Sequence, residues 1–239
     1  MHVNQNLLEQ VYNDIDWETV NNSSSFSEDN YGMIEDNLNS NLFYIATGAS
    51  KIVLVPKAKE EEFVIKIPFF SIFQDDWERH EEDEDYYGEY IELQNAPLDN
   101  DWNYCAAEVD YYNLAIEHHI EMFFPNTSLV RESPYPIYVQ ERCLEAYDTK
   151  ANTPRTKAEI NEEMDTLRAG AGPVAHNGWL YNFKASWILD AIDAYGEATL
   201  AKLFQFLDDY DINDLHASNY GYSAIDHRPV LIDFSGFHD

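Results

Sequence analysis

Residues 212–236, INDLHASNYGYSAIDHRPVLIDFSG, carry the most specific pattern in the chain. Asp214 and Asn219 lie five residues apart on one predicted loop, and Asp233 follows 14 residues later, after an apolar strand predicted at 230–232. The turn residues at 226–229 predict a short hairpin before that strand. An Asp and an Asn on one loop can serve as a base and a metal ligand, and a second Asp can bridge the metal to phosphate groups.

In this spacing the chain resembles the protein-kinase-like superfamily. The form Asp214-Leu215-His216-x-x-Asn219 is closer to aminoglycoside and choline kinase-type phosphotransferases, and to bacterial and phage kinase-like proteins, than to eukaryotic protein kinases. The latter usually carry a lysine two residues after the Asp, where this chain has His216. The resemblance covers residues 43–236 and implies an α+β, two-lobed protein-kinase-like fold with a reduced, C-terminally truncated C-lobe.

The same resemblance implies the roles of these residues and the cofactors ATP and Mg²⁺. Asp214 would orient an acceptor hydroxyl and accept its proton, while Asn219 and Asp233 would be the metal ligands. His216 would either position the transferred phosphate or brace the loop by hydrogen bonding. ATP would lie in the cleft between the two lobes.

Two upstream segments fit the family by order and spacing. The segment Ala46-x-Gly48-x-x-Lys51-x-Val53 falls at the place of the Gly-rich loop, although only Gly48 keeps the glycine. Gly48 and Ser50 are therefore candidate ATP-binding residues, since backbone N–H groups in such a loop can cradle phosphates. Lys66 follows Val53 by 13 residues and is flanked by apolar residues, which is unusual in a chain with only 14 basic residues. By resemblance it contacts the α and β phosphates.

Lys66 needs a carboxylate to hold it. Glu108, 42 residues later on a predicted helix, is the first candidate and Glu117 the second. The strand predicted at 137–140 then runs into the segment that, by resemblance, is the hinge whose backbone would bind adenine, which makes Gln140 and Arg142 candidate ATP-binding residues. The acidic segment 75–92 explains the long spacing as an insertion; it is either a solvated surface or an electrostatic docking surface.

Hydrophobic periodicity predicts the remaining elements and three regions. The regions are a polar N-terminal extension (1–40), an N-lobe with an antiparallel sheet and a helix (41–142), and a helical C-lobe (143–239). The predicted elements are a short helix around Leu7, Leu8 and Val11, a loosely ordered stretch at 21–27, a hairpin of strands 52–55 and 63–67, a helix at 106–124 with Val109, Tyr112, Ile116, Ile120 and Phe123 on one face, and a long amphipathic helix at 186–208.

The composition limits the partners. With 45 acidic residues against 14 lysines and arginines, the formal net charge is −31, which argues against binding to nucleic acid or to anionic lipid. It permits a basic protein partner, divalent cations or mimicry of nucleic acid. Cys105 and Cys143 make no disulfide framework. No signal peptide or apolar run of about 20 residues is present, so we expect a cytoplasmic protein without a membrane partner.

Three functions remain open at this point. The first is a kinase-like phosphotransferase whose acceptor is a hydroxyl, on Ser, Thr or Tyr of a host or basic protein or on a small molecule. The second is a pseudokinase or a nucleotide-gated interaction module. The degenerate Gly-rich loop favours it, and so does the short length of six residues after Asp233, where kinases continue with a substrate-binding region. The third is an acidic decoy of the DNA-mimic type. The joint presence of Lys66, Asp214, Asn219 and Asp233 favours the first.

Overall fold

The computed structural model divides the chain into two compact units. Unit 1 comprises Met1–Val109 and Thr127–Gln140, and unit 2 comprises Asp110–Asn126 and Glu141–Asp239. The described residues are 1–15, 42–47, 51–68, 71–74, 89–92, 103–132, 136–145, 162, 165, 174, 177–216 and 218–234. The predicted loose stretch at 21–27, the predicted phosphate loop with Gly48 and Ser50, and most of the acidic insertion lie outside these residues.

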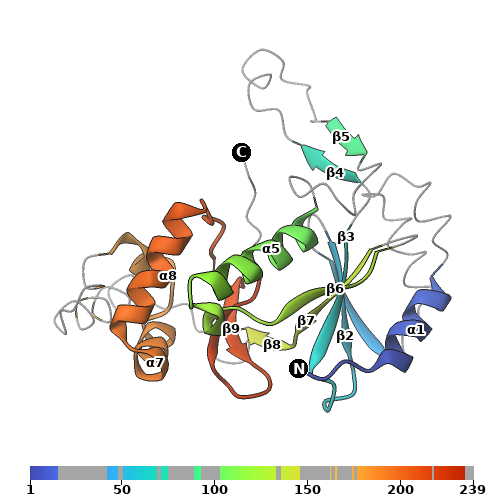
Figure 1. Ribbon diagram of the computed structural model, residues 1–239, viewed down its shortest axis with the longest axis horizontal. Helices are drawn as coiled ribbons and strands as arrows, with labels where there is room; N and C mark the ends of the chain where they lie inside the picture. Colours follow the sequence, from blue (N-terminus) through green and yellow to red (C-terminus); the bar gives the residue numbers. More distant parts are fainter. Residues whose placement is uncertain are drawn as a thin grey trace. The chain divides into compact units, whose positions relative to one another are not determined.

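Unit 1 contains a five-stranded sheet in the order β1-β2-β3-β7-β6 (Figure 1). Its strands are β1 (Phe43–Thr47), β2 (Lys51–Pro56), β3 (Phe63–Pro68), β6 (Thr127–Arg131) and β7 (Ile137–Glu141). The predicted hairpin is confirmed, because β2 and β3 pair antiparallel with Ile52 opposite Ile67 and Val53 opposite Lys66. A separate antiparallel pair is formed by β4 (Ser71–Gln74) and β5 (Glu89–Glu92).

Alternation along the strands separates the two faces of this sheet. One face carries apolar side chains that pack against helix α1 (Gln5–Asp14), which begins at the N-cap Asn4. Leu8 and Val11 of α1 are buried in this core, so the predicted N-terminal helix is present and packs into unit 1. The opposite face carries Lys51, Lys66 and Gln140 and lies against the first turns of helix α5 (Tyr104–Glu117) (Figure 1).

Helix α5 is shorter than the predicted helix at 106–124. It ends in a Schellman motif, in which the N–H of Ile120 donates to the carbonyl of Ala115 (2.9 Å) and that of His119 donates to Ile116 (3.1 Å). His119 takes a left-handed conformation with φ 58° to close this turn. Ile120 and Phe123 therefore follow the helix, so the predicted single face of a helix at 106–124 is wrong; Ile116, on the helix, is 44% exposed.

Unit 2 combines helices with a small three-stranded sheet. The sheet has the order β10-β9-β8, and the chain between β8 and β9 includes two α-helices. Besides the second half of α5, the described elements of unit 2 are η1 (Glu121–Phe123), β8 (Cys143–Glu145), η2 (Gly178–Tyr181), α7 (Ala185–Tyr195), α8 (Glu197–Asp209), β9 (Tyr220–Ser223) and β10 (Pro229–Leu231).

The single long helix predicted at 186–208 is wrong, because the chain breaks at Gly196. Gly196 has φ 83° and ψ 151°, a conformation essentially restricted to glycine. Its N–H closes α7 on the carbonyl of Ile192 (2.8 Å), and its own carbonyl accepts the first bonds of α8 from Thr199 and Leu200 (3.1 and 3.2 Å). One residue thus ends one helix and starts the next.

Aromatic side chains anchor the β9–β10 hairpin in the core of unit 2. Trp187 on α7 stacks on Phe183 at 4.6 Å and donates its indole N–H to the carbonyl of Gly221 (2.8 Å). The hydroxyl of Tyr220 accepts the backbone N–H of Lys184 (2.9 Å). Phe234, just beyond β10, packs edge-on against Phe124 at 4.9 Å. These contacts fix both ends of the hairpin.

Two further properties can be stated of the described part of the chain. None of its helices combines the length and the apolar character needed to cross a bilayer. Cys105 is buried and Cys143 is partly buried.

Candidate functional site

The predicted ion pair between Lys66 and Glu108 is present in unit 1. The Lys66 ammonium donates to both carboxylate oxygens of Glu108, at 2.8 and 2.7 Å. Their side chains are 4% and 0% exposed. The second candidate, Glu117, is an exposed residue at the end of α5. The choice of Glu108 over Glu117 is therefore confirmed, while contact with a nucleotide stays a prediction.

Glu108 binds two more groups that sequence reasoning did not assign to it. The Lys51 ammonium donates to Glu108 Oε1 (2.7 Å), and the amide of Gln140 donates to Glu108 Oε2 (3.2 Å). The same Gln140 amide also donates to the hydroxyl of Thr127 (3.1 Å). Gln140 is a predicted ATP-binding residue, and its side chain here orients the carboxylate.

Burial makes this cluster of charges sensitive to its partners. Lys51 and Lys66 are 4% and 3% exposed, and a buried charge is tolerated only when it is paired and hydrogen-bonded. The Lys51 charge also acts on Tyr104: burial raises the pKa of the Tyr104 hydroxyl, and the nearby ammonium partly offsets that rise. Unit 1 thus holds two ammonium groups in a largely dry environment.

In unit 2, the β9–β10 hairpin brings two predicted metal ligands next to each other. Asn219 precedes β9 and Asp233 follows β10, and the backbone carbonyl of Asn219 accepts N–H bonds from Ile232 (2.7 Å) and Asp233 (3.3 Å). The Asn219 side-chain amide donates to the backbone carbonyl of Asp214 (2.6 Å). Asp214, Asn219 and Asp233 are therefore joined by hydrogen bonds, while their roles as base and metal ligands stay predictions.

His216 lies beside Asp214 on the same loop. Its Nδ1 accepts the backbone N–H of Ser218 (3.4 Å) and lies 2.8 Å from the Ser218 hydroxyl oxygen. Because a backbone N–H can only donate, the proton of a neutral His216 ring is on Nε2, which lies 3.9 Å from Asp214 Oδ1. This arrangement braces the loop, and the His216 side chain remains 60% exposed.

The chemistry of Asn219 and Asp233 fits Mg²⁺. The Asn219 amide nitrogen is engaged with Asp214, which leaves its Oδ1 without a hydrogen bond to the described residues. An amide oxygen and a carboxylate are hard ligands of the kind that Mg²⁺ takes, with water and phosphate oxygens in its other positions. No cluster of three or more His, Cys, Asp or Glu side chains able to hold a metal occurs in the part of the chain that the structure describes.

The predicted hinge is tied to the β9–β10 hairpin through its backbone. The Arg142 carbonyl accepts the N–H of Ala224 (2.9 Å), and the N–H of Glu141 donates to the carbonyl of Asn126 (2.8 Å). Cys143 begins β8, opposite Ser223 of β9. Contact between this backbone and adenine remains a prediction.

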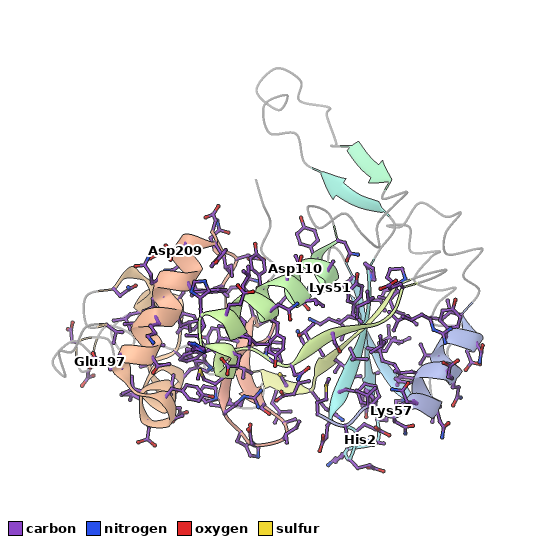
Figure 2. All side chains as sticks on the ribbon, viewed as in Figure 1. His2, Lys51, Lys57, Asp110, Glu197 and Asp209 are labelled. Atoms are coloured by element: carbon purple, nitrogen blue, oxygen red, sulfur yellow. The ribbon has the colours of Figure 1, made fainter. Side chains whose placement is uncertain are left out.

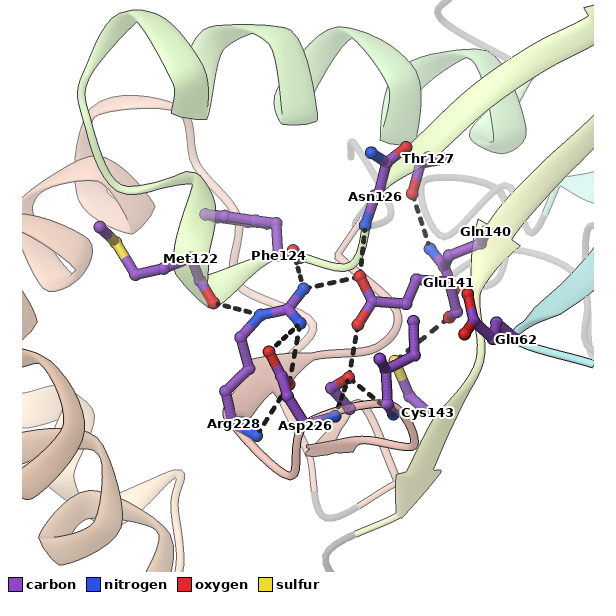
Figure 3. A network of polar contacts seen from close by, with 12 residues as sticks. Glu62, Met122, Phe124, Asn126, Thr127, Gln140, Glu141, Cys143, Asp226 and Arg228 are labelled. Atoms are coloured by element: carbon purple, nitrogen blue, oxygen red, sulfur yellow. Dashed lines mark hydrogen bonds and ion pairs between the residues drawn. The ribbon is translucent and has the colours of Figure 1, made fainter. Parts of the chain in front are cut away.

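A polar network that sequence reasoning missed surrounds Arg228, on the turn of the hairpin (Figure 3). Its guanidinium pairs with Glu141 (2.6 Å) and Asp226 (3.0 Å) and donates to the carbonyl of Met122 (3.2 Å). Glu141 also accepts the Ser223 hydroxyl (2.5 Å). No spacing rule points to this network, because it joins residues 87 positions apart along the chain.

A surface pocket in unit 1 does not involve these groups. It is open and is lined by residues of α1 and of the β2–β3 turn, among them Gln10, Lys57 and Glu61. It shares no residue with the cluster around Glu108.

No protein-family model, no curated protein and no solved structure matches this chain. The resemblance to kinase-like proteins therefore rests on the motif residues of the chain itself.

Proposed function

We propose that this protein is an ATP- and Mg²⁺-dependent phosphotransferase that moves the γ-phosphate to a hydroxyl, on Ser, Thr or Tyr of a protein. The observation that carries the proposal is the buried ion pair between Lys66 and Glu108. These residues are 42 positions apart in the sequence, and the order of the kinase-like motifs predicts that they pair. A lysine held in this way is the group that kinase-like enzymes use to bind nucleotide phosphates.

Unit 2 would supply the transfer chemistry. Asp214 would orient the acceptor hydroxyl and accept its proton, and His216 would keep the loop in place through Ser218. Asn219 and Asp233 would hold Mg²⁺, whose charge stabilises the phosphate oxygens during transfer.

Transfer of radiolabel from [γ-³²P]ATP tests the proposal. The purified chain is incubated with Mg²⁺ and a library of Ser-, Thr- and Tyr-containing peptides, and label is measured on the peptides, on the chain itself and as free phosphate. We expect label on a hydroxyl with the wild type. Asp214→Asn should reduce transfer by about 10²- to 10⁴-fold, the range typical of a lost general base.

Asp193→Asn is the matched control, because Asp193 is exposed on α7 and has no part in the site. It should transfer phosphate at the wild-type rate. Binding of ATP without transfer to any acceptor would contradict the proposal and favour a pseudokinase. Equal rates for wild type and Asp214→Asn would refute the role of Asp214.

A further inference from the structure

Two lysines converge on Glu108, although the kinase-like motif calls for one. Lys51 and Lys66 both donate to the same atom, Glu108 Oε1, at 2.7 and 2.8 Å. We propose that Lys51 is a second phosphate-binding lysine, and that the two ammonium groups together bind neighbouring phosphate groups of a nucleoside di- or triphosphate. This inference rests on the proposed function and adds a residue to its site.

The register of the sheet dictates where Lys51 lies. Lys66 on β3 is directly opposite Val53 on β2, and Lys51 precedes Val53 by two residues. Side chains two apart on a strand share a face, so Lys51 and Lys66 point to the same side of the sheet, toward α5. Figure 2 shows Lys51 close to α5, whereas Lys57, at the far end of the strand, lies away from it.

The position of Lys51 along the chain also favours a phosphate contact. It directly follows Ser50, in the segment Ala46-x-Gly48-x-x-Lys51-x-Val53. In the pattern G-x-G-x-x-G-x-V of phosphate-covering loops, this is the place of the last glycine. A charged side chain stands there instead, and it is turned inward, being 4% exposed.

The charges of the two lysines favour an anion as their ligand. Both ammonium nitrogens lie within 2.8 Å of one oxygen atom, so they are close neighbours and repel each other. Burial strengthens this repulsion, and an anion beside the pair stabilises both charges. The Lys66 ammonium directs two of its three N–H groups at Glu108. Its third N–H group has no acceptor among the described residues. A row of phosphates offers one oxygen for each lysine.

Calorimetric titration with ATP and with adenosine tests the role of Lys51. We expect Lys51→Met and Lys66→Met each to weaken ATP binding by about 10- to 100-fold, as for the loss of a hydrogen bond to a charged group, and to leave adenosine binding unchanged. Lys59→Met, at an exposed lysine of the β2–β3 turn, should bind ATP as the wild type does. Circular dichroism and thermal melting check that each variant folds.

The outcomes separate this inference from the proposed function. If Lys66→Met loses ATP affinity and a folded Lys51→Met does not, the role of Lys51 is refuted and the proposed function stands. If the wild type binds neither ATP nor adenosine, both are refuted. A loss of adenosine affinity equal to the loss of ATP affinity in Lys51→Met would show a structural role and refute the phosphate contact.

A second measurement uses the wild-type protein and so does not depend on how a variant folds. An acyl-phosphate derivative of ATP transfers its acyl group to a lysine amine beside the phosphates, and ATP leaves as the amide forms. Mass spectrometry should find both Lys51 and Lys66 acylated, and excess ATP should protect both. Acylation of Lys66 alone would overturn the inference.

Discussion

Glu108 accepts hydrogen bonds from two buried ammonium groups and one side-chain amide, and it is itself fully buried. Attraction between the charges at such a site is balanced by the cost of removing them from water. The cluster therefore affects the free energy of unfolding mainly when one of its partners is lost. A neutral side chain at position 108 would leave the buried Lys66 ammonium beside an uncharged group. The fold of unit 1 should therefore depend strongly on this one carboxylate.

We predict that Glu108→Gln lowers the free energy of unfolding by about 3 to 5 kcal/mol, the cost of breaking a buried ion pair from one side. Urea denaturation followed by circular dichroism measures the change. Glu117→Gln is the control on the same helix, and it should stay within about 0.5 kcal/mol of the wild type because Glu117 is exposed. Equal stability of the two variants would contradict the prediction.

The sequence predicted the pairing of Lys66 with Glu108 but not the contact of Lys51 with Glu108. The motif order pointed to Lys66, and its apolar neighbours set it apart from surface lysines. Lys51 could have been found by alternation, since it shares a strand face with Val53, the residue opposite Lys66. That step needs the register of the hairpin, which the sequence does not specify when the turn between the strands is long.

Gly196 is the element-scale feature with the clearest consequence, because it separates α7 from α8. A side chain there would meet no atom within 4 Å, so any cost of a substitution comes from the backbone conformation alone. Sequence periodicity missed this break because the apolar spacing continues across it. A glycine within a helix costs only about 1 kcal/mol relative to alanine, so its presence alone does not predict a break. The positive φ of Gly196 and its hydrogen bonds to both helices show that the two helices are distinct.

Gly196→Ala should therefore destabilise the protein by about 1 to 3 kcal/mol, through backbone strain. Gly178→Ala is the matched control, because Gly178 also has open space around its Cα and does not have a positive φ. Thermal melting of both variants tests the difference. The account of the helix break would be wrong if Gly196→Ala melted at or above the temperature of Gly178→Ala.

The turn of the β9–β10 hairpin should respond to acid through Asp226. Burial favours its neutral form, but hydrogen bonds and charge from Arg228 outweigh this and hold the pKa of the Asp226 carboxyl below its usual range. A lowered folded-state pKa stabilises the fold above the unfolded-state pKa of about 3.9, and that contribution is lost as pH falls through the folded value. Because Asp226 is 54% exposed, the effect should be under about 1 kcal/mol.

Denaturation at pH 7 and at steps below pH 4 tests this prediction. Wild type should lose slightly more stability than Asp226→Asn as the pH falls, since the variant has no carboxyl to protonate there. Identical acid profiles for the two proteins would show that the pair with Arg228 adds nothing to stability.

At the scale of the whole molecule, the net charge of −31 is the dominant property. Like charges repel in the folded chain, and salt screens them, with a Debye length of about 10 Å at 0.1 M that falls to about 3 Å at 1 M. The melting temperature should therefore rise between 0.05 and 0.5 M NaCl. Calorimetry in NaCl and KCl at equal ionic strength checks that the effect is one of screening; a constant or falling melting temperature would contradict it.

The β2–β3 hairpin and the strand before the predicted hinge were predictable from local patterns, whereas the α+β class followed from the resemblance to kinase-like proteins. Contacts between residues far apart in the sequence were predictable only where the order of kinase-like motifs along the chain pairs the two residues, as for Lys66 and Glu108. The Arg228 network and the α7–α8 break depend on tertiary packing and on one backbone angle, and neither leaves a periodic signal. Gly48 and Ser50 lie outside the described residues, so their predicted contacts with phosphate stay predictions.

A nucleotide site is tested by the melting temperature of wild type and Asp233→Asn with Mg²⁺ alone, with ATP alone and with both ligands. ATP with Mg²⁺ at about 100 times its dissociation constant should add about 2.7 kcal/mol, which is about 5 to 10 °C for a chain of this size. We predict that the wild type shows this shift only when both ligands are present and that Asp233→Asn does not. The absence of any shift in the wild type would contradict a nucleotide site in this protein.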